Sequence, residues 1–212
     1  IQSFELGYIK ELKKGSFSTE LYFRNTDNIR ERIQEVYDTN VIVKRPVNAG
    51  VSQALGAEFS FNKKLNKWWI LDAGSNLFYY KITGQIPGSS LDQESYTYRG
   101  RLSNNLILPK DWKIQLITNY EADVVSVQGI DKGFTSFDLA VKKDFLDRKV
   151  STTLQFRNMF ATVRRESWVD TETLYSYRLA TPRWLMVALS VSIRLNNFNN
   201  KDKIRTEQGT EF

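Results

Sequence analysis

The alternation of aliphatic residues near the end of the chain constrains the fold more than any other feature. From 185 to 195 every second residue is aliphatic: Leu185, Val187, Leu189, Val191, Ile193 and Leu195. The residues between them are mostly small or polar. A period of two predicts a β-strand with one apolar side and one polar side. About 9 to 11 tilted residues cross the hydrocarbon core of a bilayer, so this segment is typical of a barrel wall with Leu185, Val187, Leu189, Val191 and Ile193 facing lipid.

Composition excludes several other classes of protein. No apolar run approaches the roughly 18 residues that a membrane-spanning helix needs. The 212 residues include no Cys and no His, which excludes disulfides, imidazole catalysis and His-ligated metals. No spacing of carboxylates indicates an acid/base pair, and no Gly-rich phosphate loop is present, so we expect neither an enzyme nor a cofactor. The first residues do not form a signal peptide, although an outer-membrane barrel needs one for export, so we expect that the beginning is missing.

Strand-like segments recur along the whole chain. They lie near 3–12, 17–27, 49–62, 67–82, 95–108, 112–127, 134–146, 149–160 and 183–195. Tight turns at 13–16, 63–66, 109–111 and 147–149 alternate with long links near 28–48, 83–94, 128–133 and 161–181. Outer-membrane barrels have short periplasmic turns and long extracellular loops, so the last strand descends into the periplasm. A soluble β-sandwich also alternates between faces, but its loops need not sort by length.

The number of strands predicts a part of a larger barrel. Bacterial single-chain barrels close with an even number of strands, and about nine cannot close by themselves. We therefore predict an all-β fold, a transmembrane antiparallel β-barrel in which residues 1–195 form the C-terminal wall. Residues 29–37 and 163–177 either extend neighbouring strands or form short elements, and we favour an extracellular loop with ordered ends for 29–37. Residues 196–212 are expected to be a polar periplasmic tail, with a docking peptide for a partner as the alternative.

Charged residues are placed by the cost of exposing them to lipid. A charge at the bilayer midplane costs about 2 to 4 kcal/mol for Arg or Lys, so charges inside strands should face the lumen. The predicted lumen-facing charges are Glu20, Arg24, Glu58, Asp72, Arg99, Arg101, Glu121, Asp138, Lys142, Arg157 and Arg194. The net charge of +6 is scattered among turns and strands instead of forming one stripe, which argues against nucleic acid as a partner.

Aromatic residues predict two interfacial girdles. Phe17, Trp68, Trp69, Trp112 and Phe145 lie beside the short turns, whereas Tyr79, Tyr80, Tyr96, Tyr98 and Tyr120 lie toward the long links. Trp168, Tyr175 and Tyr177 lie on the longest late link. Lipid-interface anchoring is one interpretation of these three, and contact with a sugar or a partner protein outside the cell is the other.

Several motifs in order resemble the C-terminal part of TonB-dependent receptors, within the outer-membrane β-barrel family. They are Ser3-Phe4-Glu5-Leu6-Gly7-Tyr8, Leu21-Tyr22-Phe23-Arg24-Asn25-Thr26, Asn48-Ala49-Gly50, Leu108-Pro109-Lys110-Asp111-Trp112 and Phe145-Leu146-Asp147-Arg148-Lys149, ending in Arg157-Asn158-Met159-Phe160. The resemblance implies a barrel of about 22 strands with an N-terminal plug domain in its lumen. It also implies import of a siderophore, cofactor or glycan, energised by a TonB-type partner in the inner membrane. The polar tail after Leu195 departs from the family's usual aromatic end.

Two classes of function remain. In the first, the chain is part of an importer in the outer membrane of a Gram-negative bacterium, with outer-membrane lipid, the N-terminal barrel strands, the plug domain and a TonB-type protein as partners. In the second, a receptor-like barrel no longer transports and holds other proteins, such as a surface lipoprotein, in a complex. A self-contained barrel of eight or ten strands is a third possibility, which two unpaired edges in lipid disfavour.

Overall fold

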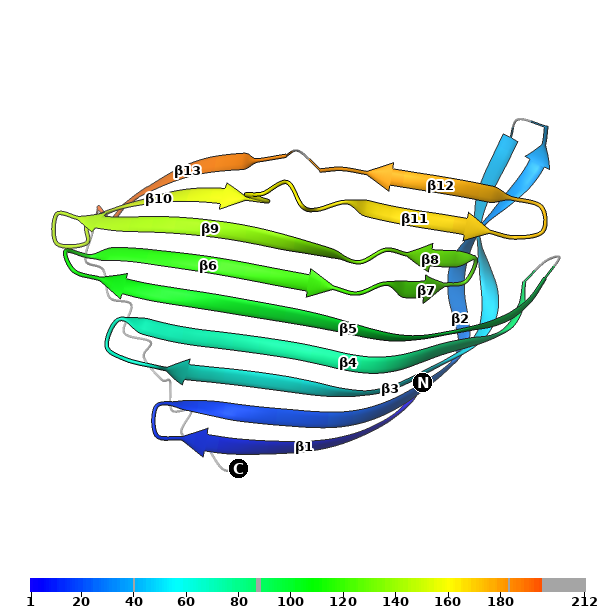
Figure 1. Cartoon of the computed structure of the whole chain (residues 1–212), viewed down its shortest axis with the longest axis horizontal. Helices are drawn as coiled ribbons and strands as arrows, with labels where there is room; N and C mark the ends of the chain where they lie inside the picture. Colours follow the sequence, from blue (N-terminus) through cyan, green and yellow to red (C-terminus); the bar gives the residue numbers. More distant parts are fainter. Residues whose placement is uncertain (40, 87–88, 183, 196–212) are drawn as a thin grey trace, which may run out of the picture.

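Thirteen antiparallel strands make up the part of the chain that the structure, a computed structural model, describes: residues 1–39, 41–86, 89–182 and 184–195. Nine of them form one sheet in the order β1-β2-β3-β4-β5-β6-β9-β10-β13 (Figure 1). Their bounds are β1 Gln2–Leu12, β2 Gly15–Asp38, β3 Val41–Lys64, β4 Trp69–Ile86, β5 Ser89–Leu108, β6 Trp112–Glu121, β9 Phe134–Phe145, β10 Val150–Arg157 and β13 Met186–Ile193. The predicted nine-strand sheet is confirmed, and β1 and β13 are its edges.

A second, smaller sheet continues the wall beyond the ends of β6 and β9 (Figure 1). Its order is β12-β11-β8-β7, with bounds β7 Val124–Ser126, β8 Gly129–Asp131, β11 Arg165–Asp170 and β12 Tyr175–Ala180. The sequence predicted one strand over 112–127 and long links over 128–133 and 161–181, with short elements as one alternative for 163–177. The single strand and the link without strands over 128–133 are wrong, because β6 ends at Glu121 and the residues beyond it pair with each other in the smaller sheet. The alternative of short elements within 163–177 is confirmed by β11 and β12.

The two remaining long links are hairpins and not loops. Residues 28–38 belong to β2 and residues 41–48 to β3, and the two strands pair from Gly15 opposite Lys63 to Asp38 opposite Val41. In the same way β4 continues to Ile86 and β5 begins at Ser89. The prediction of a loop over 29–37 is therefore wrong. Register shifts on both sides of Ile29 interrupt the period of two, so the alternation that marks the rest of β2 does not continue through this segment.

The register gives the large sheet two chemically different faces. Residues directly opposite each other on paired strands share a face. One face, here called the apolar face, holds alternate residues of 4–8, 17–23, 55–61, 71–79, 96–106, 112–120, 135–141, 150–156 and 187–193, and none of these is Asp, Glu, Lys or Arg. The other, here called the polar face, carries the charged side chains within these segments.

The tight turns lie together at one end of the sheet (Figure 1). In one of them three residues, Pro109 to Asp111, lie between the paired Leu108 and Trp112, and Lys110 and Asp111 have left-handed φ values of 60° and 58°. Lys143 is on the apolar face beside this turn, and its Nζ reaches the carbonyl oxygen of Lys110. The same Nζ is 5.3 Å from the ring centroid of Trp112, so the charge bends away from the apolar band while its stem lies along an aromatic ring.

At the other end of the sheet the β2–β3 hairpin bends and covers part of the polar face (Figure 1). The bend is at Asn28, whose φ is 56°, and at Gly50, whose φ is 108° and where a Cβ would collide with the carbonyl oxygen of Thr83. We call the part of this hairpin beyond the bend the roof. Buried apolar side chains of the roof pack against others from the sheet, and together they form the roof core: Ile29, Ile33, Ala49, Ile82, Ile86, Leu91 and Val127. Among the residues that the structure describes, no helix is long and apolar enough to cross a membrane.

Candidate functional site

The predicted lumen-facing charges lie together on the polar face. Opposite partners in the register place Glu20, Arg24, Glu58, Asp72, Arg99, Arg101, Glu121, Asp138 and Arg157 on it, and Lys142 as well. Arg194 follows β13, and its backbone N–H donates to the carbonyl oxygen of Lys149 at 2.8 Å. Period two therefore assigned every strand charge of the set to one side of the sheet.

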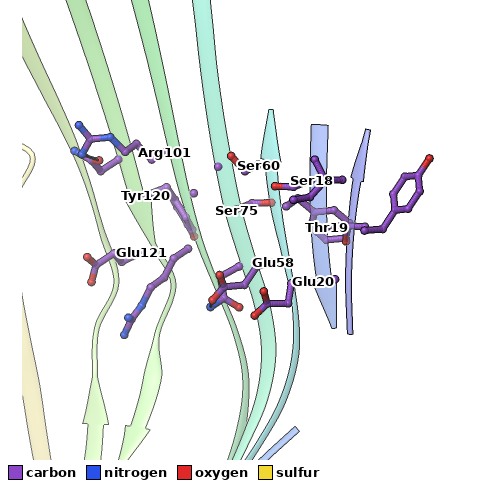
Figure 2. A pocket seen from close by; sticks show the side chains of 18 of the residues that line it. Ser18, Thr19, Glu20, Glu58, Ser60, Ser75, Arg101, Tyr120 and Glu121 are labelled. Carbon is purple, nitrogen blue, oxygen red and sulfur yellow. Dashed lines mark hydrogen bonds between the residues drawn. The ribbon is translucent and has the colours of Figure 1, made fainter. Parts of the chain in front are cut away.

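A hollow of about 840 Å³ lies over the polar face, which is therefore the concave face. Two neighbouring rows of residues across the strands form its floor (Figure 2). One row runs through Glu20, Glu58, Asn76, Arg99 and Glu121, and the adjacent row through Ser18, Ser60, Gly74, Arg101 and Asn119. The floor is thus polar across five strands from β2 to β6.

Like charges face each other at one end of the first row. Glu20 and Glu58 are directly opposite in the β2–β3 register. The Asn76 amide donates to Glu58 at 2.9 Å and its oxygen accepts from the Tyr22 hydroxyl at 3.1 Å. Arg99 is opposite Glu121 at the other end of the row. The row therefore runs from an acidic end to a mixed end and presents both donors and acceptors to whatever occupies the hollow.

Aromatic side chains line a second hollow of about 260 Å³ between this row and the roof core. Gly56 is opposite Tyr22, and a Cβ at Gly56 would meet both that ring and the Cβ of Phe78. The Arg99 guanidinium is 5.8 Å from the Phe78 ring centroid. Tyr80 lies in the same hollow and packs against the roof core, so its predicted place in a lipid-interface girdle is wrong.

The polar face also contains buried hydrogen-bond networks that the sequence did not indicate. The Asp144 carboxylate is buried near a tight turn, where it accepts from the Ser151 hydroxyl at 2.6 Å and lies 3.5 Å and 3.4 Å from the Nζ atoms of Lys113 and Lys142. Asp72 accepts from Asn105 at 2.8 Å. These contacts join neighbouring strands, and only the register reveals them.

A side-chain amide fixes the roof to the wall. The Gln34 backbone N–H donates to Gln128 Oε1 at 2.7 Å, and Gln128 Nε2 donates to the Gln34 carbonyl oxygen at 3.0 Å. Gln128 lies between β7 and β8, whereas Gln34 is in the bent part of β2. One side chain therefore satisfies both backbone groups of a residue 94 positions away, and we call this pair the glutamine clamp.

Trp168, Tyr175 and Tyr177 lie in the smaller sheet, on β11 and β12. Trp168 is opposite Tyr177, with ring centroids 5.1 Å apart, and Tyr175 is opposite Asp170. The structure therefore brings the three predicted residues together. They do not line the hollow of about 500 Å³ on the other side of this sheet, which is lined by residues including Arg99, Glu121, Asp131, Arg165 and Arg178.

Two carboxyl groups beside this third hollow have shifted pKa values. Burial raises the pKa of Asp131. Burial also acts to raise the pKa of Asp123, but the hydrogen bonds from Lys132 and from the Gly133 backbone outweigh it and lower the pKa. Asp123 Oδ2 and Lys132 Nζ are 2.5 Å apart and form a salt bridge.

The apolar face has the layout expected of a lipid-facing surface. Val187, Leu189, Val191 and Ile193 of β13 share it and are 56–68% exposed, and Leu185 precedes the strand and is 49% exposed. Tyr98 and Tyr120 stack at 5.1 Å with their hydroxyls 3.1 Å apart, toward the end that carries the roof. Trp69, near the tight turns, donates its indole N–H to Asn104 at 3.1 Å.

Among the described residues no group of three or more Asp or Glu side chains could hold a metal ion.

Comparisons with known proteins agree with this arrangement. The model of the outer membrane protein beta-barrel family matches residues 1–208. A search of curated proteins and a search of solved structures each gave no match. An open antiparallel wall with one uncharged face and one polar concave face fits the family match, and the chain belongs to the outer membrane protein beta-barrel family, located in the outer membrane of Gram-negative bacteria.

Proposed function

We propose that this chain is the C-terminal wall of a barrel of about 22 strands, and that the whole protein is a TonB-dependent receptor that imports a nutrient such as a siderophore, cofactor or glycan. The concave polar face carries the proposal. Its floor holds Glu20 and Glu58 opposite each other and Arg99 and Arg101 in neighbouring rows. A water-filled pore tolerates such groups, but a dense belt of hydrogen-bonding side chains also suits a folded polar domain inside the barrel.

The open edges of the sheet support a barrel with more strands than this wall contains. β1 and β13 each pair with one strand, and unpaired backbone groups are costly in lipid. Further strands are needed on both sides to satisfy them. In this proposal the N-terminal strands of the same protein pair with β1 and β13, its plug domain contacts the concave face, and the chain has no catalytic role.

Site-specific crosslinking tests the plug domain. A photoreactive benzoylphenylalanine in place of Glu58, within the full-length protein in cells, should crosslink to a segment N-terminal to this wall in the same polypeptide. Ala57, its neighbour on the apolar face, is the matched control position and should give lipid adducts or none. Crosslinking of the Glu58 position to water-soluble probes alone would mean an open pore and would contradict the plug.

Energised import is tested separately by growth on single nutrient sources. Deletion of the gene for this protein and deletion of the TonB-type gene should produce the same growth defect on one source, and a double deletion should be no worse. Suppose that the first deletion causes a growth defect that the TonB-type deletion does not cause, and that another protein is lost from the outer membrane. This result would contradict import.

A scaffold remains the second candidate because of the tip of the β2–β3 hairpin. Tyr37 is 80% exposed there, and Val36, Val41 and Ile42 are each nearly half exposed. The bidentate pair of Arg45 with Glu35, at 2.8 Å and 2.8 Å, stiffens the hairpin just below them. Exposed apolar side chains on paired strands bury area on binding without a further loss of backbone entropy, which favours a protein partner. Loss of a co-purifying protein on Tyr37→Ser, without a growth defect, would support this candidate.

A further inference from the structure

One face of the smaller sheet carries an unusual concentration of exposed aromatic and aliphatic side chains. Trp168 is opposite both Ile130 and Tyr177, and alternation along β12 adds Tyr175 and Leu179 to the same face. Tyr175 is 69% exposed, and Ile130, Tyr177 and Leu179 are between 42% and 49% exposed. We call these five side chains the outer patch.

The outer patch faces away from the lumen. The opposite face of the smaller sheet presents Asp131, Ser167 and Arg178, and these line a hollow together with Arg99 and Glu121 of the concave face. Since successive residues of a strand point to opposite sides, the outer patch is on the convex side. A solute inside the barrel would meet Arg178 and Asp131 and would not meet the outer patch.

The outer patch continues the lipid-facing surface beyond its tyrosine row. Phe137 of the apolar face packs edge to face on Phe160, with centroids 5.2 Å apart, and Phe160 is 61% exposed. Val125, which pairs with Ile130, is five residues past Tyr120, a distance of at most about 18 Å along the chain. Tyr residues at a membrane interface sit at headgroup level, so the outer patch lies in the layer just outside it.

We propose that the outer patch binds the sugars of the lipopolysaccharide that surrounds the protein in the outer leaflet. Flat aromatic rings bind the apolar faces of pyranose rings, and polar groups beside the rings bind the hydroxyls. Lys132 Nζ lies 5.5 Å from the Trp168 ring centroid, and the Glu166 carboxylate adjoins Tyr177, where desolvation and that carboxylate raise the pKa of the tyrosine. Continuity with the lipid-facing surface identifies the occupant, because lipopolysaccharide is what adjoins that surface above the bilayer.

This proposal does not depend on import. It assigns the outer patch to the membrane environment whether the lumen transports a solute or holds a scaffold. It also specifies the interpretation of Trp168, Tyr175 and Tyr177 as contacts for a sugar outside the cell, by naming the source of that sugar. Lipopolysaccharide surrounds the protein at all times, so its sugars occupy the outer patch whether or not a solute is bound in the lumen.

Photocrosslinking in intact cells tests the proposal with the full-length protein. Benzoylphenylalanine is placed at Tyr175, and in a second strain at Arg178, which is exposed on the opposite face of the same strand. Adducts are analysed for lipopolysaccharide by sugar-specific staining and by mass spectrometry. The Tyr175 position should give lipopolysaccharide adducts, and the Arg178 position should give at least about threefold less, the discrimination expected from contact with aromatic neighbours.

A second variant tests the role of the rings. In the background of the Tyr175 crosslinker, Trp168→Ala with Tyr177→Ala should lower the lipopolysaccharide adduct about threefold or more, with correct insertion checked by heat-dependent gel mobility. If that variant does not insert, Tyr177→Ser alone is used, because its side chain is about half exposed and contributes less packing. Adducts to another protein, to phospholipid alone, or equally from both crosslinker positions, and likewise no adduct at all, would overturn the proposal.

Discussion

Inserting a charge on each face of one strand gives the sharpest test of the two-faced wall. Leu21 and Glu20 are neighbours in β2, with Leu21 on the apolar face and 54% exposed, and Glu20 on the polar face. Leu21 is six residues from Gly15, where β2 begins, or about 20 Å along the strand. With a strand tilt of about 40°, its depth is about 15 Å, close to the middle of an apolar band about 25 Å tall.

The expected magnitudes for the two variants differ widely. Leu21→Arg should lower the free energy of unfolding by about 2 to 4 kcal/mol, which is the cost of Arg at the bilayer midplane. That is roughly a 30-fold to 1,000-fold change in the equilibrium constant. Glu20→Arg should change it by less than about 1 kcal/mol, because the new guanidinium remains in a polar hollow and faces Glu58 in place of a like charge.

The assay is equilibrium unfolding of the full-length protein in lipid vesicles by guanidinium chloride, followed by tryptophan fluorescence. Phe17→Tyr, near the tight turn, controls for the effect of adding a polar group to the apolar face close to the interface. Equal losses of stability for Leu21→Arg and Glu20→Arg would refute the assignment of the apolar face to lipid, and so would a larger loss for Glu20→Arg.

Three further predictions concern the roof. Ile33→Ala removes a fully buried side chain, and we expect a loss of about 2 to 4 kcal/mol in local stability, seen as faster hydrogen exchange of residues 29–38. Gln128→Ala removes both bonds of the glutamine clamp and should cost about 1 to 3 kcal/mol, measured by trypsin cleavage of the β2–β3 hairpin in intact cells. The Arg45 side-chain hydrogen bond lowers the pKa of Glu35 from 4.5, so the hairpin tip should be fully protected above that pH and lose protection as the pH falls through the lowered value.

Each of these predictions has a result that contradicts it. Unchanged exchange in Ile33→Ala would mean that the roof core does not hold the hairpin. Proteolysis at the tight turns instead of the hairpin after Gln128→Ala would indicate global destabilisation and not a local clamp. For the pH dependence, Glu35→Gln should remove the acid-induced loss, and persistence of that loss in the variant would assign it to another group.

The two faces of the wall were predictable from sequence because alternation with a period of two determines the face on which each side chain of a strand lies. Alternation assigned Glu20, Glu58 and Arg101 to one side and Val187 and Leu189 to the other, and the tight turns set the order of the hairpins. Such assignments depend only on neighbours in the chain and on the partner strand that the turn supplies.

The roof was not predictable because its contacts join segments far apart. The register shifts at Ile29 remove the period of two, and the mixed composition of 28–48 is also typical of a loop. The glutamine clamp requires a bend in β2 and a turn at Gln128 to meet in space, which no local pattern encodes. The face of the sheet on which Trp168 and Tyr177 lie was also not predictable from the sequence, because the smaller sheet begins a new set of strand pairings beyond Glu121.

The long sequence separation within the roof has a consequence for biogenesis. Its core unites side chains from Ile29 to Val127, and the glutamine clamp spans 94 positions. Contacts of such separation form late, after the cost of closing the intervening loops has been met. The roof therefore forms only once the hairpins from β2 to β8 stand side by side, so during insertion the polar face passes through a stage at which this hairpin does not cover it.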